Sequence, residues 1–209
     1  MDGGIAIMPF SYNAFDDYVG TLFKLLKPLR ICDIGAVAGK YGTIARRVAA
    51  QENFSTHLTA IEIDPAYVKR FNLAKIYDEV IMEDAICMIH KPRLRFDLVI
   101  FGDCIEHMRK SIGVDLINFL IYRSGYICVI YPDACVQDDW EGHAAEAHIS
   151  TWGLEDFKSW NTLHHRRSKI NLFLIKGYQP SQVTITASTA PESVAEDIHQ
   201  IAAGCCPKF

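Results

Sequence analysis

The sequence predicts an α/β protein: a doubly wound, seven-stranded, mostly parallel sheet with an antiparallel edge strand, in three α/β/α layers. Strand candidates alternate with helical patterns along the chain, which is typical of parallel sheets. Two of the candidates, residues 98–101 and 126–131, are continuously apolar, as expected of strands buried on both faces. A glycine-rich turn joins the first strand to the next helix, which is typical of nucleotide-binding sheets.

The helices follow from their residue patterns. Residues 13–27 predict the first helix, because apolar residues recur there at helical spacing and Pro28 ends the pattern. A second apolar stripe follows the glycine-rich turn. Asp64 followed by Pro65 predicts a further helix start, with Asp as N-cap and Pro at the first helical position. Residues 113–122 predict another amphipathic helix.

The strands are expected where short apolar runs lie between these helices. The candidates are residues 30–34, 57–62, 79–82, 96–101, 125–131, 161–166 and 170–175. Only Ser168 and Lys169 separate the last two, so we expect them to form an antiparallel hairpin at one edge of the sheet.

The length of 209 residues fits one main domain, which we expect at 1–178, followed by a C-terminal appendage at 179–209 that is flexible or carries a short helix at 192–203. The net charge of −4 argues against nucleic acid as a partner. No apolar run approaches the roughly 20 residues that span a bilayer, and the N-terminus lacks a basic signal start. Cys32, Cys104 and Cys128 lie in or beside apolar runs, where cysteine acts as a small hydrophobic residue, and this favours a reduced, cytoplasmic protein. The vicinal Cys205–Cys206 pair is the exception. Nothing in the sequence fixes the oligomeric state.

The glycine turn after the first strand predicts a ligand site. Gly35, Gly39 and Gly42 lack a Cβ, so backbone there can approach a ligand closely. Their spacing differs from the Gly-x-Gly-x-x-Gly fingerprint of dinucleotide-binding sheets. This variant favours a nucleoside without phosphate over a dinucleotide.

Acidic residues stand at the ends of the first four strands: Asp33, Glu62, Asp84 and Asp103. Ligands of open α/β sheets lie across these carboxyl ends. Glu62 can accept hydrogen bonds from both ribose hydroxyls, and Asp84 from an adenine amino group. Asp33 can either order the glycine turn or meet an ammonium group of the ligand. Each acid alone is more simply explained as a cap of the following helix, but the set together with the glycine turn favours a ligand site.

These motifs resemble those of the class I S-adenosylmethionine-dependent methyltransferases, over residues 30–176. The matching stretches are Asp33-Ile-Gly35-x-x-x-Gly39-x-x-Gly42, Ile61-Glu62-Ile-Asp-Pro65, Glu83-Asp84-Ala85 and Phe96-Asp-Leu-Val-Ile-Phe-Gly102-Asp103-x-Ile-Glu106-His107. The resemblance implies S-adenosylmethionine as cofactor, contacted by Asp33, Gly35, Ala36, Gly39, Glu62, Ile63, Asp84, Ala85 and Gly102. It also implies a seven-stranded sheet whose only antiparallel strand is the last. The chain departs from many members by having Gly-Ala-Val-Ala-Gly where they carry a Gly-x-Gly pair.

Methyl transfer from a sulfonium needs proximity, a desolvated pocket and sometimes a base. His107 follows the fourth strand and is the first candidate for that base, since imidazole titrates near neutral pH; Asp103 is the second. The alternative is that His107 packs over the cofactor, with Glu106 as a structural hydrogen-bonding partner, and the residues favour this slightly.

The long segment at 132–152 is expected to border the acceptor, because loops of this length in compact domains are usually functional. It is acidic and, with its flanks from 124 to 157, contains no Lys or Arg, which favours amines or neutral polyhydroxylated molecules over polyanions. Residues 148–160 also resemble a segment near the acceptor pocket in small-molecule members of the family. The expected substrate contacts are Tyr12, Tyr131, His143, His148 and Trp152. The five-residue spacing of His143 and His148 favours a lid or packing role over a metal, so we expect no metal.

The leading hypothesis is therefore transfer of a methyl group to an O or N atom of a small molecule. A nicotinamide-dependent oxidoreductase with Glu62 on a ribose is one alternative, weakened by the missing phosphate-binding glycines. A non-catalytic scaffold or partner protein that keeps the fold is another. Base methylation of nucleic acid is not favoured, because the fourth strand leads into Gly102-Asp-Cys-Ile105 rather than a proline-rich motif that holds a flipped base.

Overall fold

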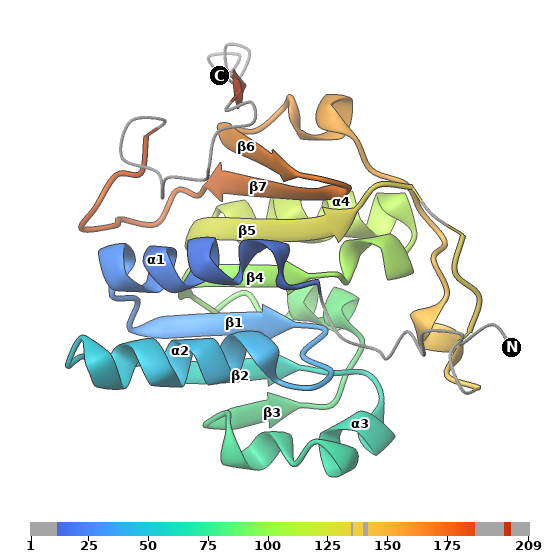
Figure 1. Cartoon of the computed structure of the whole chain (residues 1–209), viewed down its shortest axis with the longest axis horizontal. Helices are drawn as coiled ribbons and strands as arrows, with labels where there is room; N and C mark the ends of the chain where they lie inside the picture. The colour runs from blue at the N-terminus through green and yellow to red at the C-terminus, as the bar shows by residue number, and fades with distance from the viewer. Residues whose placement is uncertain (1–11, 135, 140–141, 187–198, 202–209) are drawn as a thin grey trace, which may run out of the picture.

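The computed structural model describes residues 12–134, 136–139, 142–186 and 199–201, and these residues form a mixed sheet between two layers of helices (Figure 1). The strands are β1 (Arg30–Ile34), β2 (His57–Ile61), β3 (Glu79–Ile81), β4 (Phe96–Gly102), β5 (Ser124–Pro132), β6 (Thr162–Arg167), β7 (Ile170–Lys176) and β8 (His199–Ile201). Their order across the sheet is β3-β2-β1-β4-β5-β7-β6-β8. The strands β1 to β5 pair in parallel, which confirms the predicted doubly wound arrangement.

The α-helices are α1 (Asp16–Leu26), α2 (Lys40–Gln51), α3 (Pro65–Arg70) and α4 (Lys110–Ile121). Short 3-10 helices are η1 (Asn13–Phe15), η2 (Leu73–Lys75), η3 (Ala85–His90), η4 (Ile105–His107), η5 (Ala144–Glu146) and η6 (Leu154–Phe157). The predicted start of α3 is confirmed: the Asp64 side chain accepts a hydrogen bond from the Ala66 N–H, and Pro65 occupies the first helical position. The described helices are all too short or too polar to cross a bilayer.

The sheet differs from the expectation at its antiparallel end. The strand β7 runs antiparallel to β5 as expected, but it lies between β5 and β6 rather than at the edge. The composition of the hairpin explains this order. Six of the seven residues of β7 are buried, as befits an interior strand, whereas β6 carries the polar run from His164 to Arg167. An eighth strand, β8, then pairs with β6, so the sheet is wider than the seven strands predicted.

Part of the expected C-terminal appendage lies against the sheet. The hydroxyl of Tyr126 accepts a hydrogen bond from the Ile185 N–H at 2.7 Å and donates one to the Val183 carbonyl at 3.2 Å. Residues 199–201 form a strand where the sequence suggested a helix, because they pair with β6. The boundary at residue 178 stays a prediction, and Cys205–Cys206 lies outside the described residues.

The core divides into two clusters on opposite faces of the sheet. Alternate residues of β4, such as Leu98 and Ile100, pack with α1 and α2, while Val99 and Phe101 pack with α4. Figure 1 shows α1 and α2 on the near face and α4 on the far face. Both faces of the central strands are therefore covered, and the carboxyl ends of β1 to β4 remain as the edge at which a ligand can bind.

Candidate functional site

A cavity of about 470 Å³ lies at the carboxyl ends of the central parallel strands. The strand ends and the turns after them supply Ile34, Gly35, Val37, Ile61, Glu62, Ile63, Asp64, Tyr67, Glu83, Asp84 and Ala85. The opposite wall is made by Asp103, Cys104, His107, Met108, Arg109, Ile112, Ala145, Glu146 and Ile149. The volume is in the range of sites that hold small molecules.

The glycine turn is shaped by Gly35 and Gly39, which both have left-handed φ angles, +71° and +72°. A Cβ at Gly35 would lie 2.6 Å from the Cys104 sulfur, so glycine lets the turn approach the fourth strand's loop. A Cβ at Gly39 would lie 2.6 Å from Ile76 Cδ1. Gly35 lines the cavity and Gly39 does not, so only the first of them is placed for the predicted ligand contact.

Glu62 is the carboxylate that joins β2 to the glycine turn. Its two oxygens accept hydrogen bonds from the Val37 N–H at 2.8 Å and the Asp64 N–H at 2.9 Å. The residue is only 3% exposed, and burial raises the pKa of its carboxyl group, whereas the two backbone donors lower it. Each oxygen keeps a further lone pair, so Glu62 can also accept hydrogen bonds from a hydroxyl-bearing ligand in the cavity.

Asp33 does not line the cavity, and its side chain serves the scaffold. It accepts a hydrogen bond from the Tyr77 hydroxyl at 2.5 Å, and the same hydroxyl accepts one from the Gly42 N–H at 3.2 Å. Burial raises the pKa of Asp33 to about 6 despite the Tyr77 hydrogen bond. Of the two roles predicted for Asp33, the structure shows the one that orders the glycine turn and the start of α2.

The remaining predicted cofactor residues divide into two groups. Ile63, Asp84 and Ala85 line the cavity, and the Asp84 side chain also caps η3 by accepting from the Ile86 N–H at 3.1 Å. Ala36 and Gly102 do not line it. A Cβ at Gly102 would lie 1.9 Å from the Tyr41 ring, so this glycine makes room for a core aromatic side chain.

Both predicted catalytic residues line the opposite wall. His107 is half-buried, and its Nδ1 lies 3.2 Å from the Ala147 carbonyl oxygen. Burial is the main reason why the pKa of His107 falls to about 4, and the neighbouring His148 lowers it further. Asp103 has a left-handed φ of 50°, and its carboxylate accepts a hydrogen bond from the Tyr12 N–H at 3.0 Å. Because its pKa is lowered to about 4, His107 is a neutral imidazole near pH 7.

The segment after β5 is held against η4 by backbone hydrogen bonds. The Glu106 carbonyl accepts from the Ile149 N–H at 2.9 Å and from the Ser150 N–H at 3.1 Å. This pairing brings His148 to His107, with ring centroids 4.7 Å apart. Three residues of the segment at 132–152 line the cavity, Ala145, Glu146 and Ile149, and the expectation that this segment borders the acceptor stays a prediction.

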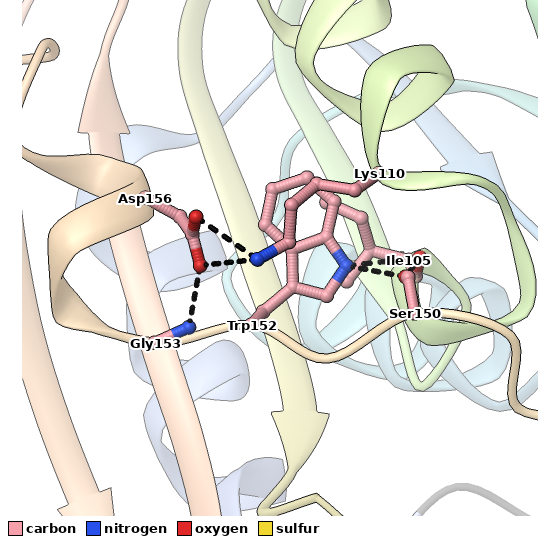
Figure 2. A network of polar contacts seen from close by, with 6 residues as sticks. All are labelled: Ile105, Lys110, Ser150, Trp152, Gly153 and Asp156. Atoms are coloured by element: carbon pink, nitrogen blue, oxygen red, sulfur yellow. Dashed lines mark hydrogen bonds and ion pairs between the residues drawn. The ribbon is translucent and has the colours of Figure 1, made fainter.

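Trp152 anchors this segment rather than lining the cavity (Figure 2). Its indole N–H donates to the Ile105 carbonyl at 3.2 Å and to the Ser150 hydroxyl at 2.9 Å, and only 8% of the residue is exposed. Lys110 reaches across the indole, its Nζ 5.4 Å from the ring centroid, to the Asp156 carboxylate. The structure thus gives Trp152 a packing role in place of the predicted substrate contact.

The other predicted substrate residues also lie outside the cavity lining. Tyr131 is buried in the core beside the stacked rings of Phe157 and Phe173, because its position on β5 turns it toward the α4 face. His143 lies 2.5 Å from the Asp64 carboxylate and 4.6 Å from the Tyr67 ring, both of which line the cavity. Tyr12 donates its backbone N–H to Asp103 on this wall, and its side chain is largely exposed.

Sequence reasoning missed several lining residues. Met108, Arg109 and Ile112 follow directly after His107, so a longer reading of the fourth motif would have included them. Tyr67 lies one turn into α3, and its aromatic ring gave no signal that distinguishes it from a core residue. Glu146 was one of the acids of the long segment, but nothing in the pattern selected it from its neighbours.

Comparisons with known proteins place the fold. No family model and no curated protein sequence matches the chain. Among solved structures, an O-methyltransferase family protein from Burkholderia thailandensis has a TM-score of 0.57 at 9% identity, over 78% of this chain and 55% of that one. This chain therefore spans about half the length of that protein.

Two further neighbours were determined with S-adenosylhomocysteine. The N-terminal domain of EvdMO1 has a TM-score of 0.56 at 14% identity, over 80% of this chain and 83% of that one. The plantazolicin methyltransferase BpumL has a TM-score of 0.53 at 13% identity, over 79% of this chain and 83% of that one. At such identities the similarity shows the fold alone, and the chain has the Rossmann-like fold of the class I S-adenosylmethionine-dependent methyltransferases.

Proposed function

We propose that the protein transfers a methyl group from S-adenosylmethionine to an O or N atom of a small molecule. The observation that carries this proposal is that Gly35 and Glu62 line the same cavity. Gly35 lies in a turn whose backbone a ligand can approach closely, and Glu62 is a buried carboxylate beside that turn. Such a pair suits a ribose held against the first turn of the sheet. The neighbours solved with S-adenosylhomocysteine support the choice of cofactor.

The cofactor contacts proposed are the lining residues Gly35, Glu62, Ile63, Asp84 and Ala85. Glu62 accepts the ribose hydroxyls, and Asp84, beyond β3, is placed for the adenine amino group. Three further residues support these contacts without lining the cavity. Asp33 orders the glycine turn through its hydrogen bond from Tyr77, and Gly39 and Gly102 leave room for neighbouring side chains.

The reaction is an in-line displacement. A lone pair of the acceptor atom forms a bond to the methyl carbon while the carbon–sulfur bond breaks, and its electron pair stays on sulfur to give a neutral thioether. The proton of the acceptor goes to a neighbouring group, for which Asp103 and the neutral His107 on the cavity wall are the candidates. The wall supplies proximity and exclusion of water, which methyl transfer chiefly requires.

The acceptor is a small neutral or amine-bearing molecule rather than a nucleic acid or a polyanion. Asp103, Glu146, Glu83 and Asp64 all line the cavity, which gives its mouth a negative character that Arg109 offsets only in part. Neighbours that are O-methyltransferases favour oxygen as the acceptor atom.

Calorimetry with S-adenosylhomocysteine tests this proposal on the full chain, with reduced nicotinamide cofactor as the comparison. We expect saturable one-site binding of the first compound and none of the second. Transfer of labelled methyl groups to a library of amines and hydroxyl compounds then tests turnover. Absence of any affinity for S-adenosylhomocysteine would overturn the proposal, and binding without methylation of any acceptor would favour a scaffold.

A further inference from the structure

Three side chains with metal-binding groups meet beside the cavity wall. One ligand atom each from Glu106, His107 and His148 can be chosen so that all three lie within 4.8 Å of one another. Two of these residues belong to η4, and the third is brought to them by the backbone pairing of Ile149 with Glu106. Imidazole nitrogen and carboxylate oxygen bind Zn²⁺ at about 2.0–2.2 Å, so three ligand atoms this close together can share one ion.

The Glu106 side chain is the strongest sign that something belongs there. The residue is 4% exposed, and neither of its carboxylate oxygens has a hydrogen-bonding partner within the described part of the chain. Buried carboxyl groups are normally hydrogen-bonded, paired with a cation or bound to a metal. Asp103 and Glu146 add two nearby negative charges that repel a charge on Glu106. A divalent cation at this point would offset most of this negative charge.

His107 is already oriented as a ligand. The Ala147 carbonyl can only accept a hydrogen bond, so the His107 Nδ1 atom at 3.2 Å carries the proton. In the neutral ring the lone pair then lies on Nε2. Histidines that bind metals typically donate their other ring N–H to a backbone carbonyl or a carboxylate in this way.

We propose that Glu106, His107 and His148 bind one divalent transition-metal cation of the Zn²⁺ or Fe²⁺ type. Two imidazoles and one carboxylate select this class over Mg²⁺ and Ca²⁺, which prefer oxygen ligands alone. Three protein ligands leave at least one coordination position for a substrate or water, as in catalytic sites. The sequence grouped His148 with His143, but the structure separates them, since His143 pairs with Asp64.

The open position gives the site a function. His107 lines the cavity, so a cation on it lies at the wall and can bind a hydroxyl oxygen of the acceptor. Coordination lowers the pKa of such a hydroxyl. Asp103 then remains as the group that takes the proton, while His107 serves as a ligand. This role, unlike metal binding itself, rests on the proposed methyl transfer.

Calorimetric titration of the chelator-treated full chain with Zn²⁺ tests the site, with Co²⁺ absorption as a second probe of the ligand set. We expect one equivalent to bind, and His148→Ala and Glu106→Gln each to weaken it at least about 100-fold, which is at or beyond the upper end of the about 10–100-fold cost of losing a second-shell partner. His143→Ala removes a histidine from the same segment but outside the cluster, so it should bind the metal as the wild type does.

Binding that persists unchanged in His148→Ala, or a wild type that binds no metal, would overturn the proposal. Glu106 is buried and its variant can fail to fold, but His148 is half-exposed and its variant keeps the test decisive. Calorimetry with S-adenosylhomocysteine separates the two proposals. Cofactor binding without metal binding removes only the metal site, and metal binding without cofactor binding removes only the methyltransferase.

Discussion

The two walls of the cavity are built in different ways. The strand-tip wall, which includes Gly35, Glu62 and Asp84, consists of the ends of β1 and β2 and of residues in the turns and the helix that follow β1, β2 and β3. The loop wall, which includes His107, Glu146 and Ile149, joins η4 to a segment about 40 residues further along the chain. One wall is fixed by the register of parallel strands and the other by a few long-range hydrogen bonds. The side chains of His143 and Glu146 link the two walls through Asp64 and Tyr67. We expect changes away from these contacts to leave the other wall largely intact.

The largest effect is expected from Trp152→Ala, which removes the anchor of the loop wall. Loss of a buried tryptophan destabilises a protein by about 3–5 kcal/mol, and here two hydrogen bonds to Ile105 and Ser150 disappear as well. Denaturant unfolding measures this cost. Cofactor affinity of the variant at low temperature should stay close to that of the wild type, because the Trp152 indole hydrogen-bonds to Ile105 and Ser150 rather than to Gly35, Glu62 or Asp84.

Trp160→Ala is the matched control, since Trp160 is equally buried but bonds Asn118 rather than the loop wall. It should lower stability without changing the binding of metal, whereas Trp152→Ala should weaken metal binding by releasing His148. If both variants lose metal or cofactor to the same extent, the walls are not independent.

The second prediction concerns the support of the strand-tip wall at Asp33. Its pKa is raised to about 6 from 3.8, so between about pH 4 and 6 the folded protein holds a proton that the unfolded chain has lost. Raising the pH through this window therefore favours unfolding. This rise in pKa from 3.8 to about 6 corresponds to a loss of stability on the order of 3 kcal/mol, since a tenfold change in proton affinity is worth about 1.4 kcal/mol.

The measurement is the free energy of unfolding of the wild type and of Asp33→Asn at several pH values. The variant cannot titrate at this position, so the difference between the two curves should change between pH 4 and 6 and be flat on either side. Parallel curves would show that Asp33 does not hold a proton in the fold.

The third prediction tests the strand-tip wall directly. Glu62→Ala should weaken S-adenosylhomocysteine binding by about 1.5–3 kcal/mol, because charge-assisted hydrogen bonds to the ligand are lost. Calorimetry gives the affinity. Glu52→Ala, which removes a partly exposed carboxylate directly after α2 that pairs with Lys24, controls for charge. Zn²⁺ binding at the loop wall should not change in either variant. Normal cofactor affinity in Glu62→Ala would remove the ribose assignment.

The difference between the walls also explains what the sequence could predict. The sequence predicted that Gly35, Glu62 and Asp84 lie together because each follows an apolar strand by one to three residues and parallel strands bring their ends together; all three line the cavity. The cluster of Glu106 with His148 could not be found, because it depends on which residues of a long segment pair with η4. Tyr131 and Trp152 were expected to contact the substrate because they lie at the end of β5 and in the long segment after it. Their side chains instead pack into the core, and sequence position alone does not give the direction of a side chain.

The smallest loss of stability is expected from Lys110→Met, since Lys110 lies over the Trp152 ring. Lys110 bonds both oxygens of Asp156 and lies over the Trp152 ring, but its side chain is about half-exposed, and such exposed pairs contribute about 0–1 kcal/mol. Methionine keeps most of the aliphatic stem over the ring and removes the charge. Measuring the free energy of unfolding at low and at high salt separates the contribution of the ion pair from that of the apolar contact, since the ion pair weakens with salt and the apolar contact does not. A cost as large as that of Trp152→Ala would mean that charge, rather than burial of the indole, holds the loop wall in place.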